Sequence, residues 1–398
     1  MSLINIISAI GNNKSIYPLL VRDCGIEIPS KVVLTYNQNL KDSKQMAYNA
    51  TRERLIDEYG TSAIWLGGIP VMNKLCDWGI KKAGYNPSVN VNLFREKNNQ
   101  GLKYNIKIFQ KSAPDVVKEL EKVLNNKNAY QKLQACKFIL STAIPVTLMG
   151  FILPKLNFKL TEKIREKQIK NVKNSTANPT FMGVSSSLAN MSTVNKMAVT
   201  DGGLTVGRVA TARNKYEKME MAFKMLMMMF LNFVAPIWIA KTFDKMSGKL
   251  FKTNVNLDPK LMGDKEFLQS IKNNTLELPK NDYIEFLDKN PKADFSKLCE
   301  KYCGIKYLKN GVRDPRIWVD EEKIKNFKNE IKKFSDEAIS SKNIDKYAKK
   351  ALKVKSANIL ANVGISSFLL AVALPELTFW LRKKVTGSDA EPGLTNKK

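Results

Sequence analysis

Four uncharged apolar runs, each carrying a proline near its end, divide the chain. They cover residues 59–73, 138–154, 225–240 and 356–375, and contain fifteen, seventeen, sixteen and twenty residues. Their apolar character is continuous, which is typical of a helix that is buried on all sides or immersed in lipid. Because a membrane-spanning helix needs about 20 such residues, the fourth run is the strongest candidate for a span and the second comes next.

The four prolines set the expected shape of these helices. Pro70, Pro154, Pro236 and Pro375 each follow an apolar residue, and each run passes directly into a Lys-containing amphipathic segment. A proline inside a helix has no N–H to donate, and its ring clashes with the preceding turn. The pattern therefore predicts hydrophobic helices that are kinked or terminated at proline.

The remaining sequence is polar and mostly of helical periodicity, so we predict a mainly α-helical fold: a membrane-associated helical body with a polar helical insert. By composition we divide the chain into an N-terminal region with the first run and amphipathic helices (1–134), a hydrophobic segment with a basic amphipathic helix (135–173), a Ser/Thr/Asn/Gly-rich loop or linker (174–214), a hydrophobic segment (215–250), a polar α-helical domain (251–355) and a C-terminal hydrophobic segment with a polar tail (356–398).

One stretch departs from helical periodicity. Val89 and Val91 alternate with asparagines, and Tyr104, Ile106 and Ile108 alternate with polar residues, with a glycine between the two sets. Alternation with period two favours strands. A small β-hairpin near 88–109 is therefore an alternative to helix in this region.

Basic residues follow the second and fourth runs. A Lys-rich amphipathic segment after an apolar run suits the surface of an anionic membrane, where each Lys contributes about 1 kcal/mol. The alternative is a solvated helix face. The residues we assign to the membrane surface are Lys155, Lys159, Lys163, Arg165, Arg382, Lys383 and Lys384.

The 174–214 segment contains a glycine-rich stretch. Gly202 and Gly207 have the spacing of the outer glycines of a phosphate-binding loop, but Arg208 stands where that loop needs Lys, and no buried strand precedes it, so we reject a nucleotide site. Long loops are often functional. The hypothesis that remains is a binding loop formed by Asp201, Gly202, Gly203, Gly207, Arg208 and Arg213.

The charge balance restricts the partners. The chain has 65 Lys and Arg against 37 Asp and Glu, a net charge of +28, and only ten of the cations are Arg. Specific nucleic-acid recognition usually relies on the Arg fork, whereas Lys suits diffuse attraction to anionic lipid. We therefore expect anionic membrane lipids as partners, allow for a protein partner on the polar helical domain, and disfavour nucleic acid.

The chain contains no histidine, which removes the usual general base and the commonest metal ligand. The five cysteines include Cys299 and Cys303 on one helical face, and two thiols without further ligands make a poor zinc site. We accordingly expect no enzyme activity, no catalytic, cofactor or metal site, and no small-molecule substrate.

Three functional classes follow from these features. The first is a non-enzymatic integral or monotopic membrane protein with a structural, scaffolding or membrane-shaping role. The second is a transporter or channel component; such proteins carry ionisable residues within the membrane, and the four runs contain none. The third is a soluble basic nucleic-acid-binding protein. We expect a membrane location, although lysines on both sides of three runs give no orientation.

Overall fold

The computed structural model describes residues 3–12, 15–41, 43–97, 99–168 and 193–388. Within these ranges the chain is helical, and its only extended pairings are two isolated bridges. The predicted mainly α-helical fold is confirmed. The alternative hairpin near 88–109 is wrong, because Val91–Arg95 (η3) and Leu102–Phe109 (α6) are helical; Leu93 and Leu102 are completely buried in one apolar cluster, which compact turns satisfy better than a two-stranded ribbon.

The chain forms two compact units, and each is assembled from three separate stretches. Unit 1 comprises residues 1–8, 77–136 and 241–359, and unit 2 comprises residues 9–76, 137–240 and 360–398. Besides α1 (Leu3–Gly11), four long helices have residues in both units: α5 (Ile69–Lys82), α8 (Lys127–Thr147), α12 (Ala235–Phe251) and α18 (Ile344–Phe368).

Unit 1 contains short helices around an apolar core. Besides η3, α6 and parts of the four shared helices, it contains α1 (Leu3–Gly11), α7 (Pro114–Asn125), α13 (Pro259–Met262), α14 (Lys265–Lys272), α15 (Tyr283–Lys289), α16 (Asp294–Cys303) and α17 (Glu321–Ser340). Helices α14, α15 and α16 all pack against α17, where Phe295, Ile331 and Phe334 have no exposed surface. Burial of this apolar face supplies the main stabilisation of unit 1.

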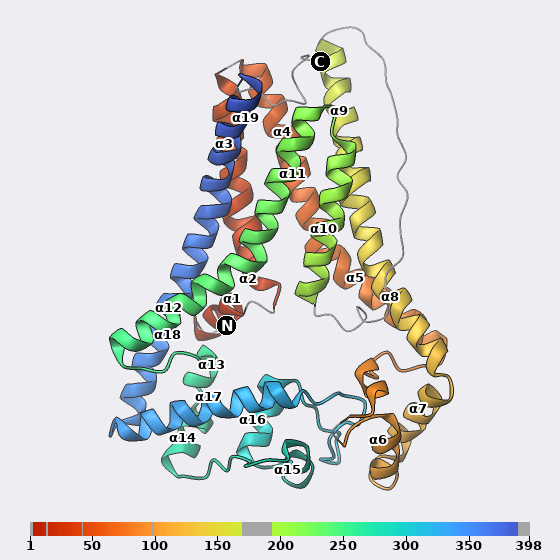
Figure 1. Cartoon of the computed structure of the whole chain (residues 1–398), viewed down its shortest axis with the longest axis vertical. Helices are drawn as coiled ribbons and strands as arrows, with labels where there is room; N and C mark the ends of the chain where they lie inside the picture. Colours follow the sequence, from red (N-terminus) through yellow and green to blue (C-terminus); the bar gives the residue numbers. More distant parts are fainter. Residues whose placement is uncertain (1–2, 13–14, 42, 98, 169–192, 389–398) are drawn as a thin grey trace. The chain divides into compact units, whose positions relative to one another are not determined.

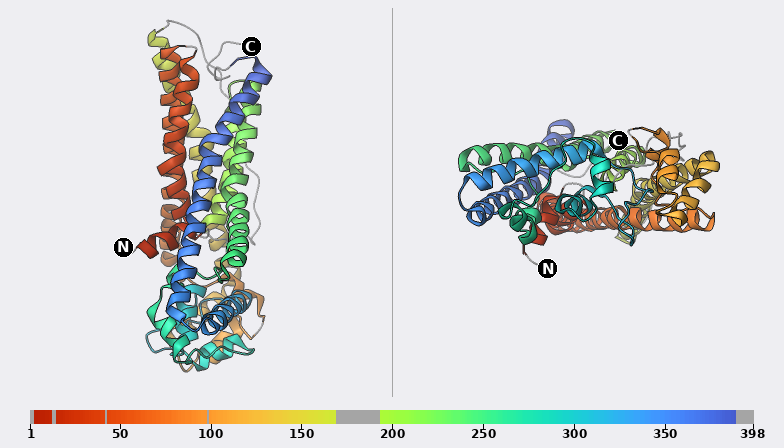
Figure 2. Two further views of the ribbon diagram at one scale, coloured as in Figure 1. Left: turned by 90° about the vertical axis from the view of Figure 1, so that its left-hand side faces the viewer. Right: turned by 90° about the horizontal axis from the view of Figure 1, so that it is seen from below.

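Unit 2 is a bundle of long helices (Figures 1 and 2). Its further elements are α2 (Tyr17–Arg22), η1 (Asp23–Glu27), α3 (Ile28–Leu40), α4 (Lys44–Ala63), η2 (Ile64–Gly68), η4 (Leu148–Ile152), α9 (Leu153–Gln168), α10 (Thr193–Thr211), α11 (Lys215–Met229), η6 (Phe230–Val234), η7 (Leu369–Ala373) and α19 (Leu374–Thr386). In this bundle α4 packs against α3 and α9, and α11 packs against α10 and α19.

Each of the turns η1, η2, η4, η6 and η7 is a π-helical turn that ends two residues before a proline. The prolines are Pro29, Pro70, Pro154, Pro236 and Pro375, so the structure adds a fifth member to the four expected from the sequence. In four of the five, the residue just before the proline donates its N–H to the carbonyl five positions back. The helices therefore continue through their prolines.

The wide turn makes room for the proline ring, which in an α-helix clashes with the carbonyl four residues earlier. That carbonyl also loses its donor. Side chains of other helices approach two of these carbonyls: Arg22 Nη2 lies 3.4 Å from the Asn232 oxygen, and Thr211 Oγ1 lies 3.5 Å from the Gly150 oxygen. Both contacts are long, and both link neighbouring helices at a π turn.

The 193–211 part of the expected loop is helix α10, and residues 174–192 of that segment lie outside the described residues. Gly203 and Gly207 are four apart and lie against α8 and η4. A Cβ at Gly207 would approach the Gly150 Cα to 2.9 Å, and one at Gly203 would approach Val146 to 2.9 Å. The glycines therefore serve close helix packing, as small residues do in membrane bundles.

Among the residues that the structure describes, three helical stretches are long and apolar enough to cross a membrane: Lys127–Ile164, Lys215–Phe251 and Ile344–Thr386. Their composition is compatible with the expected membrane location. Unit 2 also exposes many large apolar side chains, including Val33, Leu148, Ile152, Leu156, Val206, Leu226, Trp238, Leu360, Phe368 and Trp380. An apolar exterior of this extent is typical of a surface that is covered by lipid or by another protein.

Candidate functional site

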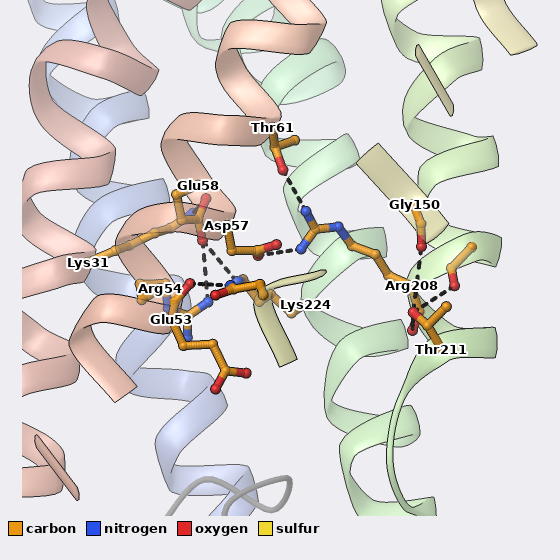
Figure 3. A network of polar contacts seen from close by, with 12 residues as sticks. Lys31, Glu53, Arg54, Asp57, Glu58, Thr61, Gly150, Arg208, Thr211 and Lys224 are labelled. Atoms are coloured by element: carbon orange, nitrogen blue, oxygen red, sulfur yellow. Dashed lines mark hydrogen bonds and ion pairs between the residues drawn. The ribbon is translucent and has the colours of Figure 1, made fainter. Parts of the chain in front are cut away.

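Charged side chains meet inside unit 2, between α3, α4, α10 and α11 (Figure 3). Lys31 comes from α3, Arg54 and Glu58 from α4, Arg208 from α10 and Lys224 from α11. Lys31 and Arg208 are only 2% and 6% exposed, so these are interior groups. We call this set, together with Glu53, Asp57 and Thr61, the charged cluster.

Helix α4 supplies much of the charged cluster because of its spacing. Glu53, Asp57 and Thr61 recur every four residues and therefore share one face. Leu55 and Tyr59 lie on other faces and are 44% and 40% exposed. This is the reverse of a helix on a water-soluble domain, where the charged face lies outside.

Glu58 is the centre of the charged cluster. Its Oε1 lies 3.1 Å from Lys224 Nζ and 3.3 Å from Arg54 Nη1, and its Oε2 lies 3.9 Å from Lys31 Nζ. Lys31 also forms an ion pair with Glu27, one helical turn earlier. One carboxylate thus faces three cations, which offsets part of the cost of taking these charges out of water.

Arg208 joins α10 to the opposite side of α4. Its guanidinium forms an ion pair with Asp57 through Nη1, and its Nη2 donates to Thr61 Oγ1 at 2.5 Å. The third nitrogen, Nε, is buried without a hydrogen-bond partner. Arg208 therefore keeps one donor that the described protein atoms do not use.

Two further arginines hold acidic residues of α11. Arg213 contacts Glu217 at 2.8 Å and Glu53 at 3.0 Å, and its guanidinium lies 4.1 Å from the centre of the Phe158 ring. Arg382 of α19 binds Glu220 through Nε and Nη2 and is 3% exposed. Paired planar contacts of this kind fix the orientation of both groups.

A small cavity of about 60 Å³ lies within the charged cluster. The residues around it are Glu53, Arg54, Asp57, Pro154, Asn157, Phe158, Arg208, Thr211, Arg213, Glu217, Glu220, Met221 and Lys224. A water molecule occupies about 30 Å³ of liquid, so the cavity has room for two waters or one small ion. Its lining contains four acidic and four basic side chains, so their charges balance.

A second buried polar group lies at the π turns. Arg22 donates to the backbone and side-chain oxygens of Asn232, each at 3.4 Å, while the neighbouring Asp23 is 7% exposed and its Oδ1 has no hydrogen-bond partner. Contacts between η1 and η7, and between η6 and η7, bring these turns together. Buried polar groups thus extend beyond the charged cluster.

The residues expected in a binding loop lie on or just after α10. Arg208 belongs to the charged cluster, Arg213 flanks its cavity, and Asp201 and Gly202 are partly exposed. Gly203 and Gly207 make the close helix contact described above. A loop is therefore the wrong description, because the segment presents its arginines from a packed helix and its end.

The residues expected at a membrane surface divide into three groups. Lys159 and Lys163 on α9, and Lys383 and Lys384 on α19, are exposed, and Lys155 is partly exposed. The expectation for Arg382 is wrong, because Glu220 draws it into the bundle. The side chain of Arg165 lies outside the described residues.

Sequence reasoning missed Lys31, Arg54, Asp57, Glu58 and Lys224. The available signal was the pair of charge repeats on α4, Glu53 with Asp57 and Arg54 with Glu58, beside an apolar run. Taken alone, such repeats indicate a solvated helix face. Only the packing of α3 and α9 against α4, and the ion pairs that reach α4 from α10 and α11, show that they face inward.

Among the described residues, no group of three or more Cys, Asp or Glu side chains is placed to hold a metal ion. Comparison of the whole chain with protein-family models, with curated proteins and with solved structures gives no match. The functional argument therefore rests on the geometry of the chain itself.

Proposed function

We propose that this chain is a non-enzymatic membrane protein that acts as a transporter or channel component for a small charged solute. The observation that carries the proposal is the charged cluster around Glu58, enclosed by helices with exposed apolar side chains. Ionisable groups inside a membrane are costly and mark solute or proton pathways. The apolar runs contain none, but α3, α4, α10 and α11 supply them between the runs.

The π turns support the same proposal. η1 and η6 both contact η7, and η2 contacts η4, so the interruptions gather in two places within the bundle. Transporters commonly form their sites where helices are interrupted, because the freed backbone groups and polar side chains are available there. The long contact between Arg22 and the Asn232 carbonyl is one such use of a freed group.

The charged cluster contains both acidic and basic side chains, so its solute can be a small anion or a small cation. An incoming anion would compete with Glu58 for Lys224, and an incoming cation would compete with Lys224 for Glu58. Because the ion pairs can exchange partners in this way, charge stays balanced during passage. The cavity of about 60 Å³ suits a small ion in the present arrangement, and a larger solute requires the helices to separate.

A structural or membrane-shaping role is the second candidate. It is favoured by α9, where Leu156 and Leu160 are 60% and 42% exposed beside Lys159 and Lys163, while Asn157 and Thr161 are buried. Such a helix can insert its leucines into an anionic membrane surface. This role, however, gives no function to the charged cluster.

The test is electrical. The full chain is reconstituted into liposomes, and currents on a solid-supported membrane are recorded after concentration jumps of potassium chloride or potassium glutamate. We expect currents from the wild type and from Glu285→Gln, whose ion pair with Lys289 is exposed, and strongly reduced currents from Glu58→Gln. Carbonate extraction of the liposomes confirms insertion. Inserted wild-type protein without any current would contradict transport of these ions and favour the structural role.

A further inference from the structure

Unit 1 contains a large polar groove of its own. It lies between the end of α12, the turn 252–256, the end of α17 and the start of α18, and has a volume of about 980 Å³. Its lining includes Lys241, Lys245, Lys249, Lys252 and Lys333, with Asp244, Asp336 and Glu337 as its acidic residues. We call it the lysine groove.

Cations follow one side of the lysine groove. Lys241, Lys245 and Lys249 are four residues apart on α12, so they share a face, and all three are exposed. Lys252 follows directly after the helix, and Lys333 contributes from α17. A row of this kind attracts an anion more strongly than the same lysines dispersed over a surface.

Two of the acidic residues are already engaged by other partners. Asp244 accepts from Lys355 at 2.5 Å and from Asn358 at 2.9 Å. Glu337 accepts a hydrogen bond from the Tyr347 hydroxyl at 2.7 Å. Asp336 is exposed. Positive charge therefore predominates among the lining groups that remain available.

Two buried polar side chains of the lysine groove lack partners. Thr253 and Asn254 are 4% and 5% exposed, and neither the Thr253 hydroxyl nor the Asn254 Nδ2 makes a hydrogen bond. The Asn254 side chain is oriented, because its Oδ1 accepts from the backbone N–H of Asn256 at 3.0 Å. Burying a donor without a partner costs about 1–3 kcal/mol, so these two positions are suited to an acceptor-rich ligand.

Lys252 directly follows α12 and has a left-handed backbone conformation. Its φ is +48°, in the left-handed region that favours glycine. A lysine is present at this position, with its side chain lining the groove. The carbonyl end of α12 would repel an anion, but the Lys350 ammonium covers the Phe251 oxygen at 2.7 Å.

We propose that the lysine groove binds a phosphate-bearing anion. The lysines supply charge, and Thr253 and Asn254 supply hydrogen bonds to phosphate oxygens. The phosphate can belong to a lipid headgroup or to a free solute. The lipid source rests on the membrane location proposed above, because Lys241 directly follows the uncharged 225–240 stretch, which brings these lysines to headgroup level if that stretch spans. Binding of the phosphate group itself does not depend on the membrane location.

The test measures binding to the purified full chain in a zwitterionic detergent. The probes are dioctanoyl phosphatidic acid, dioctanoyl phosphatidylcholine and inorganic pyrophosphate, titrated by calorimetry. We expect phosphatidic acid to bind, and its affinity to fall on the order of tenfold in the double variant Lys245→Ser, Lys249→Ser. The matched control is Lys325→Ser, Lys332→Ser, two exposed lysines of unit 1 outside the groove, which should bind as the wild type does.

Lys252→Gly separates binding from folding. Glycine relieves the left-handed backbone, so thermal stability should hold or rise while the affinity falls. If pyrophosphate competes with phosphatidic acid, the lysine groove recognises the phosphate group itself. If phosphatidic acid binds and pyrophosphate does not, the groove recognises a lipid headgroup. Both outcomes support the proposal. Absence of binding by both anions, or equal loss in the control pair, would overturn it. Transport currents do not enter this result, so failure of the proposed transport is distinguishable.

Discussion

In unit 1, Phe334 and Ile331 are fully buried and Lys325 is exposed; in unit 2, Lys31 and Arg208 are buried and Leu226 is 61% exposed. Charged and apolar side chains are thus distributed differently between interior and surface in the two units. Sorting in unit 1 follows the hydrophobic effect in water. Sorting in unit 2 is expected where lipid is the solvent, since apolar side chains then gain little by leaving the surface.

The comparison also shows what a buried charge requires. Unit 1 buries Arg313, which binds Asp288 of α15 through Nε at 2.6 Å. In unit 2 the buried Arg208 reaches Asp57, a carboxylate on another long helix. Buried charges in unit 2 therefore connect long helices in addition to the apolar contacts between them.

The largest expected effect comes from removing the centre of the charged cluster. Glu58→Ala leaves Lys224, Arg54 and Lys31 without their shared acceptor, and breaking a buried pair costs about 3–5 kcal/mol. Denaturant unfolding in lipid nanodiscs measures the loss. Glu285→Ala, which removes the exposed pair with Lys289 in unit 1, should cost at most about 1 kcal/mol. Equal losses of stability for the two variants would contradict the difference between the ion pairs of the two units.

A lysine on the outer surface tests which solvent each unit contacts. Leu226→Lys in unit 2 should destabilise the inserted protein by about 2.5–3.5 kcal/mol if Leu226 faces the centre of a bilayer. Ile339→Lys in unit 1, where Ile339 is 54% exposed, should change stability little. Stability in nanodiscs is measured for both variants, and a harmless Leu226→Lys would show that this face is not in lipid.

Close helix packing in unit 2 predicts a smaller loss. Gly207→Ala places a Cβ 2.9 Å from the Gly150 Cα, a backbone atom that cannot easily move, so we expect a cost of about 1–3 kcal/mol. Gly79→Ala, in the unit 1 part of α5 and with nothing within 4 Å, should stabilise by about 0.5–1 kcal/mol. Thermal unfolding distinguishes the signs; the same sign for both would refute the packing argument.

Asp264 provides a pH test in unit 1. Partial burial alone raises the pKa of Asp264, but hydrogen bonds from Lys301 and from the N–H groups of Phe267 and Glu266 outweigh it, so the pKa lies below the ordinary 3.8. A lowered folded pKa stabilises the fold above the unfolded pKa, and this contribution is lost as pH falls through the folded value.

Asp264→Asn keeps a side chain that can cap α14 but loses the charge that binds Lys301 at 2.7 Å, so it should weaken α14 by less than about 1 kcal/mol at neutral pH. Hydrogen exchange of the α14 amides measures this loss. The difference from wild type should shrink as the pH falls below about 4, where the unfolded carboxyl becomes protonated, and disappear below the lower pKa of the folded state. A difference that is constant with pH would show that the carboxylate charge is not responsible.

The smallest net change is expected when a whole ion pair is replaced. Arg382→Met together with Glu220→Leu removes both buried charges and keeps apolar volume, which is often neutral or stabilising. Either substitution alone leaves an unpaired charge and should be clearly destabilising. A double variant as unstable as the single variants would mean that Arg382 and Glu220 contribute through other contacts.

The helical fold and the four helices interrupted at proline could be predicted from the sequence, because both depend on local patterns. The π turns themselves were not predicted, and the one before Pro29 was missed altogether because Asp23 and Glu27 interrupt its apolar run. The 193–211 helix was also missed, because Gly203 and Gly207 weaken helix propensity; their value lies in tertiary contact with α8 and η4.

The charged cluster could not be predicted for a different reason. Glu53, Asp57 and Thr61 form a polar face with ordinary helical spacing, and that face indicates water unless the neighbouring helices are known. Which side of a helix faces inward depends on its solvent and its partners. The absence of charge in the apolar runs therefore says little about the interior of the bundle, because other segments supply its buried charges.

The π turns have a consequence for how the long helices are aligned around their axes. An inserted residue turns every later side chain by about 100°, because an α-helix has 3.6 residues per turn. A helical wheel drawn straight through Ile64–Gly68 consequently assigns α5 to the wrong sector relative to α4. Each Pro-associated π turn rotates the side chains that follow it about the helix axis. One helix can therefore present its charged side inward before the turn and a different side inward after it.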